Sequence, residues 1–196
     1  SQISEGGGVL GALGTHAIDI LHWFFGPTKN LNGLISTSIK ERLNPLTGQN
    51  EKVTSEDVAL SHLQLLNEAT NSLIPVQLTL SAVAREGRGC WLEIYGSEGT
   101  LLLGSNNLKD YVHGFGLWLT KAGGKVENIF PDEDLNFDKT WSDGRIAPVA
   151  RLQSWWAESI RKSNPVIPGL REALTSQKVC ESIKESSTNS QRIFIG

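Results

Sequence analysis

The chain has 196 residues, of which 39% are hydrophobic and 20% charged, and its formal net charge is −3. These values are typical of a globular protein with one well-filled core and argue against a disordered chain. Because no long basic run occurs, we expect neither nucleic acid nor an anionic membrane surface as the main partner. No signal peptide and no apolar run of about 18 residues is found, so we expect a cytoplasmic protein.

The stretch Gly6–Gly26, GGGVLGALGTHAIDILHWFFG, combines a glycine run with a predicted helix. At about 100° per residue, one side of this helix is apolar and is expected to face the core. The residues of this expected core stripe are Leu10, Leu13, Ala17, Ile20, Leu21 and Phe24. The residues expected on the opposite face are Ala12, His16, Asp19 and Trp23.

His16 and Asp19 are three residues apart and therefore share one face of the predicted helix. Spacing alone favours a structural role, in which His16 bonds to Asp19 or to a carbonyl group. The alternative is that His16 is a general acid/base, since an imidazole exchanges protons near neutral pH. The glycines in front of the helix supply the backbone freedom that a turn or a closely approaching ligand requires.

After Gly26-Pro27, which ends the helix, apolar runs alternate with turn residues. The expected strands are Leu31–Lys40, Asp57–Leu66, Ser72–Ala84, two segments of Trp91–Leu103 on either side of Gly96–Gly99, Leu117–Thr120, Lys125–Ile129 and Arg192–Ile195. Further helices are expected at Val149–Lys162 and Leu170–Ser186, with a loop or flap at Glu41–Thr54 and an acidic irregular loop at Pro131–Pro148. The fold class is therefore α+β, with a mainly antiparallel sheet that helices cover on one face.

The two cysteines, Cys90 and Cys180, lie far apart in a predicted strand and a predicted helix. We expect both to be buried free thiols, and the sequence spacing predicts no metal site. The other histidines, His22, His62 and His113, have no partner at a useful spacing, so we expect no catalytic role for them.

A family resemblance lies in the order of a glycine run, Leu10, Gly14, His16, Asp19 and Gly26. This order resembles the opening of the C-terminal domain of the Gfo/Idh/MocA oxidoreductases, the family of glucose–fructose oxidoreductase and inositol dehydrogenase. The pair Glu56-Asp57, the Gly96–Thr100 hairpin and the proline-glycine turn before the last helix also resemble that family. One position departs from the pattern, because Ala12 stands where the family carries its catalytic aspartate.

The resemblance implies a dihydrodipicolinate-reductase-like C-terminal domain, with residues 1–196 forming a single domain for substrate binding and oligomerisation. It implies an NAD(P)-dependent oxidoreductase that acts on a sugar, a cyclitol or a related polyol. We expect NAD or NADP to be held mainly by an N-terminal Rossmann domain in front of this chain, which itself has no methionine and no GxGxxG fingerprint. We therefore expect the chain alone to be inactive, and to form a homo-dimer or tetramer through an open sheet face.

For the site, the resemblance implies that His16 acts as the catalytic acid/base beside the substrate oxygen. The substrate site is then expected to include Ala12, Thr15, Asp19 and Trp23. The Thr15 hydroxyl would contact a polyol, and the Trp23 indole would stack on it. Asp19 either orients His16 or bonds locally and keeps the helix packed.

Ala12 leaves several functions open, because an alanine neither carries a proton nor binds a hydroxyl group. In the first, His16 and the upstream lysine of the family suffice for the oxidoreductase reaction. In the second, the protein is a non-catalytic sensor of a dinucleotide or a sugar, and its sheet mediates protein contacts. In the third, it is a NAD-dependent glycosidase, in which a transient oxidation eases elimination without net turnover of the cofactor.

Overall fold

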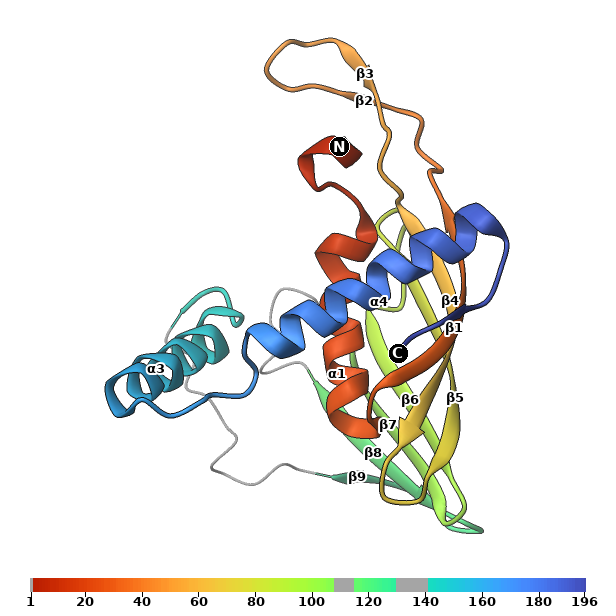
Figure 1. The fold of residues 1–196 in the computed structure, drawn as a ribbon, viewed down its shortest axis with the longest axis vertical. Helices are drawn as coiled ribbons and strands as arrows, with labels where there is room; N and C mark the ends of the chain where they lie inside the picture. Colours follow the sequence, from red (N-terminus) through yellow and green to blue (C-terminus); the bar gives the residue numbers. More distant parts are fainter. Residues whose placement is uncertain (1, 108–114, 130–140) are drawn as a thin grey trace. The chain divides into compact units, whose positions relative to one another are not determined.

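The computed structural model describes residues 2–107, 115–129 and 141–196 (Figure 1). The chain divides into two compact units. The first comprises Ser1–Arg85 and Ile167–Gly196, and the second comprises Glu86–Val166. Both contain antiparallel sheet and helix, which confirms the α+β class predicted from the sequence.

The first unit contains a four-stranded antiparallel sheet in the order β10-β1-β4-β5. Its strands are β1 (Thr28–Ser36), β4 (Val58–Asn67), β5 (Ser72–Ser81) and β10 (Ile193–Phe194). β4 and β5 pair without a register shift along their whole length, so alternate apolar residues of both strands share one face. The strands predicted at Asp57–Leu66 and Ser72–Ala84 thus pair with each other, and the closing strand predicted at Arg192–Ile195 is present as β10.

Helices cover one face of this sheet, as predicted. α4 (Leu170–Asn189) crosses β1, and α1 (Thr15–Phe25) packs against α4 and β4 (Figure 1). A 3-10 turn (Ile3–Glu5) and a π-helical segment (Leu10–Gly14) precede α1. The buried hydrophobic residues of the described chain all belong to this unit: Val9, Leu10, Ile18, Leu21, Leu31, Val53, Ala59, Leu63, Leu65, Val179, Cys180 and Ile183.

The contact between α4 and β1 depends on a glycine and two serines. β10 pairs with only the first part of β1, so the following N–H groups of β1 lie at an open edge. Ser186 Oγ accepts a hydrogen bond from the N–H of Gly33 at 2.9 Å, and Ser187 Oγ accepts one from Ile35 at 3.0 Å. A Cβ atom at Gly33 would lie 2.5 Å from the carbonyl oxygen of Ile183, so a glycine is needed for this approach.

The first helix turns a different side to the core than the sequence predicted. Leu10 and Leu21 are buried as expected, but the buried line between them runs through Gly14 and Ile18. The expected core residues that are exposed instead, by 43%, 45% and 45%, are Leu13, Ile20 and Phe24. The buried residues Leu10, Gly14, Ile18 and Leu21 are spaced i, i+4, i+8 and i+11. At about 100° per residue these four positions span an arc of about 80°, so the helical period holds, and packing against α4 and β4 selects a different side of the helix.

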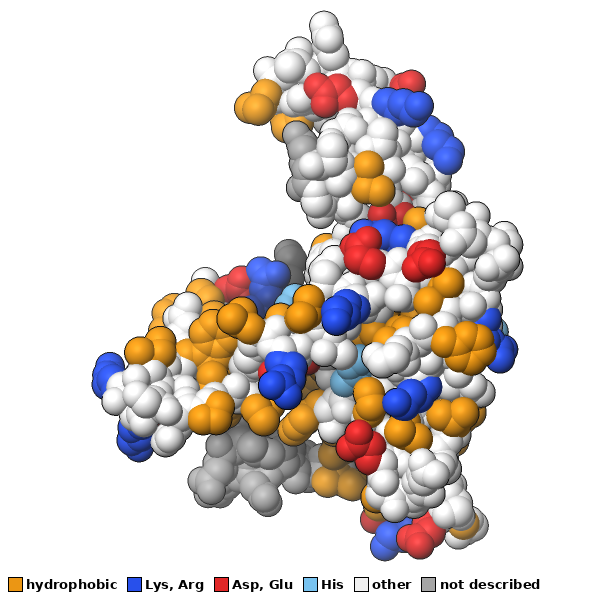
Figure 2. All heavy atoms as spheres, in the orientation of Figure 1, with side chains coloured by type: hydrophobic (Ala, Val, Ile, Leu, Met, Phe, Trp, Pro, Cys, Tyr) orange, Lys and Arg blue, Asp and Glu red, His pale blue; other side chains and the backbone are white. Residues whose placement is uncertain are grey.

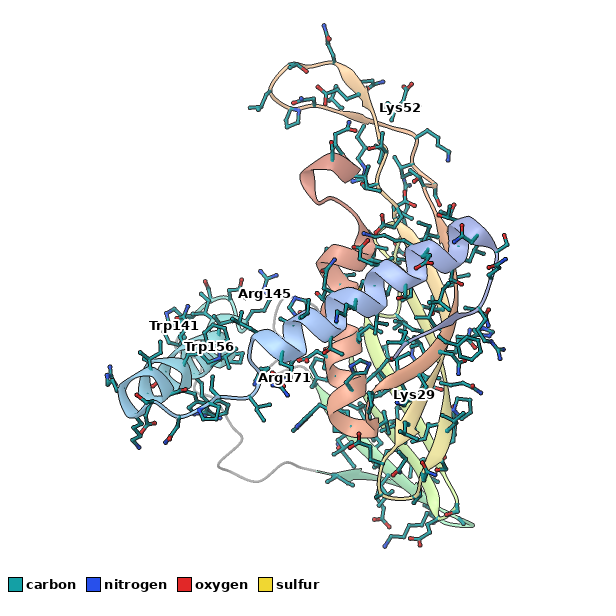
Figure 3. All side chains as sticks on the ribbon, in the orientation of Figure 1. Lys29, Lys52, Trp141, Arg145, Trp156 and Arg171 are labelled. Atoms are coloured by element: carbon teal, nitrogen blue, oxygen red, sulfur yellow. The ribbon has the colours of Figure 1, made fainter. Side chains whose placement is uncertain are left out.

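A two-stranded ribbon extends from the first unit within the expected loop or flap. β2 (Glu41–Leu43) and β3 (Asn50–Lys52) pair across a turn in which the N–H of Asn44 donates to the Gln49 carbonyl at 2.8 Å. Leu46 at this turn is 94% exposed, and Lys52 extends from the ribbon (Figure 3). The ribbon carries mostly polar residues, so its sequence has no hydrophobic alternation that would predict the two strands.

The second unit contains the antiparallel meander β6-β7-β8-β9 and the helix α3. These elements are β6 (Cys90–Gly96), β7 (Gly99–Ser105), β8 (Gly116–Lys121), β9 (Val126–Ile129) and α3 (Ile146–Lys162). The strands predicted on either side of Gly96–Gly99 pair with each other, as do those predicted at Leu117–Thr120 and Lys125–Ile129. Of the expected acidic loop, residues 131–140 lie outside the described residues, and its last three residues are helical. Pro148 is accepted there because the N–H groups of a first helical turn need no partner within the helix.

Aromatic side chains lie on one face of this second sheet. The rings of Trp91 and Trp118 stack with centroids 5.8 Å apart. The Arg88 guanidinium lies 4.3 Å from the Trp91 ring centre and pairs with Glu93 at 3.0 Å. Helix α3 buries none of its residues, and hydrophobic side chains are exposed along it (Figure 2).

The two thiols differ in burial. Cys180 in α4 is buried and free, as predicted. Cys90 is also free, but it is exposed, so the predicted burial is wrong. It begins β6, which is an edge strand of its sheet and therefore has a neighbouring strand on one side only.

Candidate functional site

Glu56 fixes the start of the helix that carries His16. The Glu56 side chain is 4% exposed, and its Oε1 accepts a hydrogen bond from the N–H of Leu10 at 3.1 Å. The Glu56 carbonyl accepts a second one from Val9 at 3.0 Å. Gly8 has φ +132°, and a Cβ atom there would lie 2.2 Å from Glu56 Oε1. The third glycine of the run therefore provides both an unusual backbone angle and the space for the carboxylate.

The neighbouring carboxylate, Asp57, fixes the chain on its other side. It accepts hydrogen bonds from the N–H groups of Ser38 at 2.7 Å and Ile39 at 2.8 Å. Burial by itself raises the pKa of Asp57, but these hydrogen bonds and the charge of Arg42 lower the pKa overall. Asp57 is therefore an ionised structural group that holds the end of β1 against the start of β4.

The face expected to carry the site is turned to solvent. Ala12, His16 and Trp23 are exposed and Asp19 is half-buried, on the side of the helix away from Leu10, Gly14, Ile18 and Leu21. The four residues thus share a face, as the spacing predicted. No hydrogen bond between the described side chains of His16 and Asp19 is formed. The charge of Asp19 instead acts to raise the pKa of His22.

His22 has a structural role. Its Nε2 accepts a hydrogen bond from the N–H of Thr28 at 3.2 Å and lies 2.8 Å from the Thr28 hydroxyl oxygen. An Nε2 that accepts carries no proton, so the ring is neutral with its proton on Nδ1. Burial lowers the pKa of His22, and the charge of Asp19 offsets part of that shift.

Thr15 and Trp23 differ in how accessible their side chains are to a ligand. The Thr15 hydroxyl donates to the carbonyl of Gly11 at 3.4 Å, so it is partly engaged within its own helix. Trp23 is 78% exposed, and its ring lies 4.9 Å from that of Phe24, between centroids. Of the two, Trp23 presents the larger free surface.

A pocket of about 210 Å³ lies beside the start of the helix. Its lining includes Gly7, Gly8, Ala12, Arg42, Val53 and Glu56. Ala12 is the one expected site residue in the lining; the catalytic candidate His16 is not part of it. Glu56 and Arg42 were not among the expected site residues. The resemblance of Glu56-Asp57 to a family motif was the signal that pointed to this place.

The helix start is not suited to the pyrophosphate of a dinucleotide. Free N–H groups at a helix N-terminus bind phosphate, but here Leu10 and Val9 already donate to Glu56. A buried carboxylate at the same place repels a second anion. The described residues therefore do not fit the phosphates of NAD or NADP at this helix.

A second pocket lies on the face of the sheet opposite α4. Gly33 of β1 faces α4 and pairs with Ser61 of β4, which therefore faces α4 as well. His62 follows Ser61 in the strand and so points to the opposite face of the sheet. The pocket measures about 410 Å³ and is lined by polar side chains that include Asn32, His62, Gln77 and Arg192. His62 is exposed, as expected, whereas His113 lies outside the described residues.

Neither a metal-binding cluster nor a membrane-spanning helix occurs in the described segments. No group of three or more His, Cys, Asp or Glu side chains there is arranged to hold a metal ion. No helix in those segments combines the length and apolarity needed to cross a membrane.

Residues 2–195 match the model of an oxidoreductase family, C-terminal alpha/beta domain. An uncharacterized oxidoreductase of Synechocystis sp. is 43% identical over 187 residues, which cover 95% of this chain and 49% of the relative. The chain thus spans about half the length of the curated relative that it matches.

Solved structures share the fold. A levoglucosan dehydrogenase, in complex with NADH and levoglucosan, aligns with a TM-score of 0.72 and 19% identity over 97% of this chain and 51% of its own. An oxidoreductase from Agrobacterium radiobacter, in complex with NAD+, L-tartaric acid and magnesium, aligns with a TM-score of 0.66 and 19% identity, over 95% of this chain and 48% of its own. The family match and the 43% identity together show that this chain belongs to the Gfo/Idh/MocA oxidoreductase family, as its C-terminal alpha/beta domain.

Proposed function

We propose that the chain is the substrate-binding and oligomerisation domain of a longer NAD(P)-dependent oxidoreductase that acts on a sugar, a cyclitol or a related polyol. Family membership and the half-length match to the relative support this proposal. The complexes of two structural neighbours with NADH and levoglucosan, and with NAD+ and L-tartaric acid, support the cofactor and the class of substrate. Residues 1–196 then form a single domain of that longer protein.

The observation that carries the proposal is the presentation of His16. The imidazole lies exposed on a helix whose opposite side is buried and whose start is fixed by Glu56. An exposed imidazole can meet a substrate hydroxyl without any rearrangement of the buried side of the helix. His16 is therefore the proposed acid/base for that hydroxyl.

The other residues of the exposed face have lesser proposed roles. Trp23 offers an exposed indole on which a polyol can stack, and Asp19 lies one helical turn from His16. Thr15 contributes only if its hydroxyl leaves the Gly11 carbonyl. Ala12 provides space in place of the carboxylate that the family carries.

The cofactor is proposed to be NAD or NADP, held mainly by a Rossmann domain outside this chain. The poor fit of the first helix to a pyrophosphate supports this division. Turnover by the 196-residue chain alone is accordingly not expected.

The open face of the sheet β10-β1-β4-β5 is the proposed contact between subunits of a homo-dimer or tetramer. Four large hydrophobic side chains on this face are exposed: Leu34, Leu60, Leu73 and Phe194. The register places Leu34 of β1 opposite Leu60 of β4, so these two side chains are neighbours in one patch. An exposed apolar patch of this kind is typical of a protein interface.

The test uses the longer protein that contains this chain. NAD(P)H formation is measured against a panel of sugars and cyclitols for the wild type, for His16→Ala and for the control Glu68→Ala. Loss of a general acid/base is expected to lower kcat by about 10²–10⁴. The control, which removes an exposed side chain from the β4–β5 turn, should keep full activity.

Two outcomes favour the alternatives. If the cofactor binds but no substrate turns over, Ala12 supports a non-catalytic sensor of a dinucleotide or a sugar. If a glycoside is cleaved without net formation of NAD(P)H, the protein is a NAD-dependent glycosidase. Equal activity of the wild type and His16→Ala refutes the role of His16.

A further inference from the structure

A row of polar side chains crosses the face of the first sheet opposite α4. The register places Asn32 of β1 opposite His62 of β4, and His62 opposite Gln77 of β5. The antiparallel register of β10 with β1, continued by two residues, places Arg192 beside Asn32. Because opposed side chains of a sheet have Cβ atoms about 5 Å apart, these four residues form one continuous polar row.

The polar row offers hydrogen-bond donors that no described residue uses. All four of its side chains are exposed, and none forms a hydrogen bond or an ion pair with the described part of the chain. The guanidinium has five N–H donors and a permanent positive charge, and the amides and the imidazole add further donors. In the next row, Asn30 is 7% exposed and donates to Gln64 Oε1 at 2.9 Å, which leaves the amide nitrogen of Gln64 to donate.

The 410 Å³ pocket on this face is lined by the polar row together with Asn30 and Gln64. Its volume falls in the range of about 300–1,000 Å³ that is usual for ligand sites. Among the described lining residues there is no aspartate or glutamate, so Arg192 meets no counter-charge there. Such a lining suits a ligand that carries negative charge and accepts several hydrogen bonds. A carboxylate or a phosphate group has both properties.

We propose that this pocket binds an oxyanion, either a carboxylate or a phosphate group, with the Arg192 guanidinium as its charged partner. The side chains of Asn32, His62 and Gln77 donate to its remaining oxygens. The site is distinct from the helix that carries His16, because that helix packs with α4 on the other face of the sheet.

The pocket adjoins the apolar patch proposed as the contact between subunits. Leu34 and Leu60 are the next opposed pair on this face after Asn32 and His62. A contact there would take Arg192 partly out of water, and an enclosed charge needs a counter-charge. The bound anion supplies that charge, so it should favour this contact. This consequence rests on the proposed function, whereas the site itself does not.

The test measures the binding of two probe anions to the 196-residue chain. The isotope-labelled chain is titrated with sodium phosphate and with sodium succinate at constant ionic strength, and the amide shifts of Asn32, His62 and Gln77 are followed by NMR. Saturable shifts are expected with at least one anion, and the two titrations show which oxyanion the pocket prefers. Myo-inositol, which is neutral, should give no saturable shift.

Three variants identify the groups that bind the anion. Arg192→Gln removes the charge but keeps an amide donor, so Kd is expected to rise at least about tenfold. Gln77→Ala removes one neutral donor and should raise Kd by about two- to tenfold. The control Arg171→Gln removes the same charge from an exposed position of α4, on the other side of the sheet, and should leave Kd unchanged. Arg192 and Gln77 are both exposed, so their variants are expected to fold.

Three results would overturn the proposal: no saturable shift with either anion, equal Kd values for wild type and Arg192→Gln, or equal binding of myo-inositol and the anions. The outcomes also separate the site from the proposed function. If the longer protein turns over a polyol but neither anion binds, the anion site fails and the function stands. If an anion binds through Arg192 but no polyol is turned over, the anion site stands and the oxidoreductase function fails.

Discussion

The two units of this chain bury their apolar residues to very different degrees. In the first unit, α1 and α4 pack on one sheet, and this unit contains every buried hydrophobic side chain that is described. In the second unit, no large hydrophobic side chain of the described residues is fully buried. Ile160 of α3 is 78% exposed, and Trp141 and Trp156 (Figure 3) also expose much of their surface.

The difference shows where the chain can hold a site rigidly. A sheet needs a second layer to bury its apolar face, and the first unit supplies that layer itself. The helix that presents His16 belongs to that unit, and its buried side is fixed by Leu10, Ile18 and Leu21. Catalytic geometry benefits from such a support, because a site is only as precise as the packing behind it.

The largest expected effect concerns the two thiols, one in each unit. Cys90 is exposed, whereas Cys180 is buried and burial raises its pKa to about 11. A thiol-specific reagent at pH 8 should therefore modify one cysteine of the native chain. Modification of Cys180 requires unfolding, and for a stability of about 5 kcal/mol or more it should be at least about 10³-fold slower.

The measurement follows absorbance after addition of an aromatic disulfide, with Cys90→Ser as the control. That variant should stay unmodified until denaturant is added. Partial burial raises the pKa of Cys90 as well, so its reaction should quicken as the pH rises. Rapid modification of both thiols would contradict the expected difference between the two units, because it would show that the first unit opens easily.

A matched pair of substitutions tests the core directly. Ile183→Ala in α4 removes a fully buried side chain and should lower the free energy of unfolding by about 2–5 kcal/mol. Ile160→Ala makes the same chemical change in α3, where the side chain is exposed, and should stay within about 0.5 kcal/mol. Denaturant titration monitored by circular dichroism measures both. A loss well above 1 kcal/mol at Ile160 would show that α3 is covered in the folded protein.

The smallest expected effect concerns two aspartates. Asp57→Asn replaces one acceptor oxygen by an amide donor and should lower the free energy of unfolding at pH 7 by about 2 kcal/mol. The pKa of Asp57 is lowered in the folded chain, so its stabilisation is complete above the unfolded value of about 3.9. This stabilisation is lost as the pH falls through the folded value. The difference between wild type and variant should therefore shrink below about pH 4.

Asp143 in the second unit is the comparison for this measurement. Hydrogen bonds from the side chain and N–H of Arg145 lower the pKa of Asp143 to about 2, but the pair is exposed to solvent. Exposed ion pairs contribute little, so Asp143→Asn should change stability less than Asp57→Asn does. The reverse order would show that the capping of β1 by Asp57 matters less than its geometry indicates.

Much of the fold follows from local patterns in the sequence. The alternation of β4 and β5, the glycine turn between β6 and β7 and the stop at Gly26-Pro27 are each properties of a short segment. Hydrophobic period and turn chemistry act over a few residues, which is why such elements can be predicted. The shared face of His16 and Asp19 is predictable for the same reason.

The sequence by itself thus determined the α+β class, most helices and strands, and the exposed face that carries His16. Only the tertiary structure decided which residues of the first helix are buried, because the packing of α1 against α4 and β4 selects the buried side. It also decided the role of Glu56, which reaches Leu10 across 46 residues, and the separation of the chain into two units. Contacts between distant segments depend on how the elements pack, and no local period in the sequence records them.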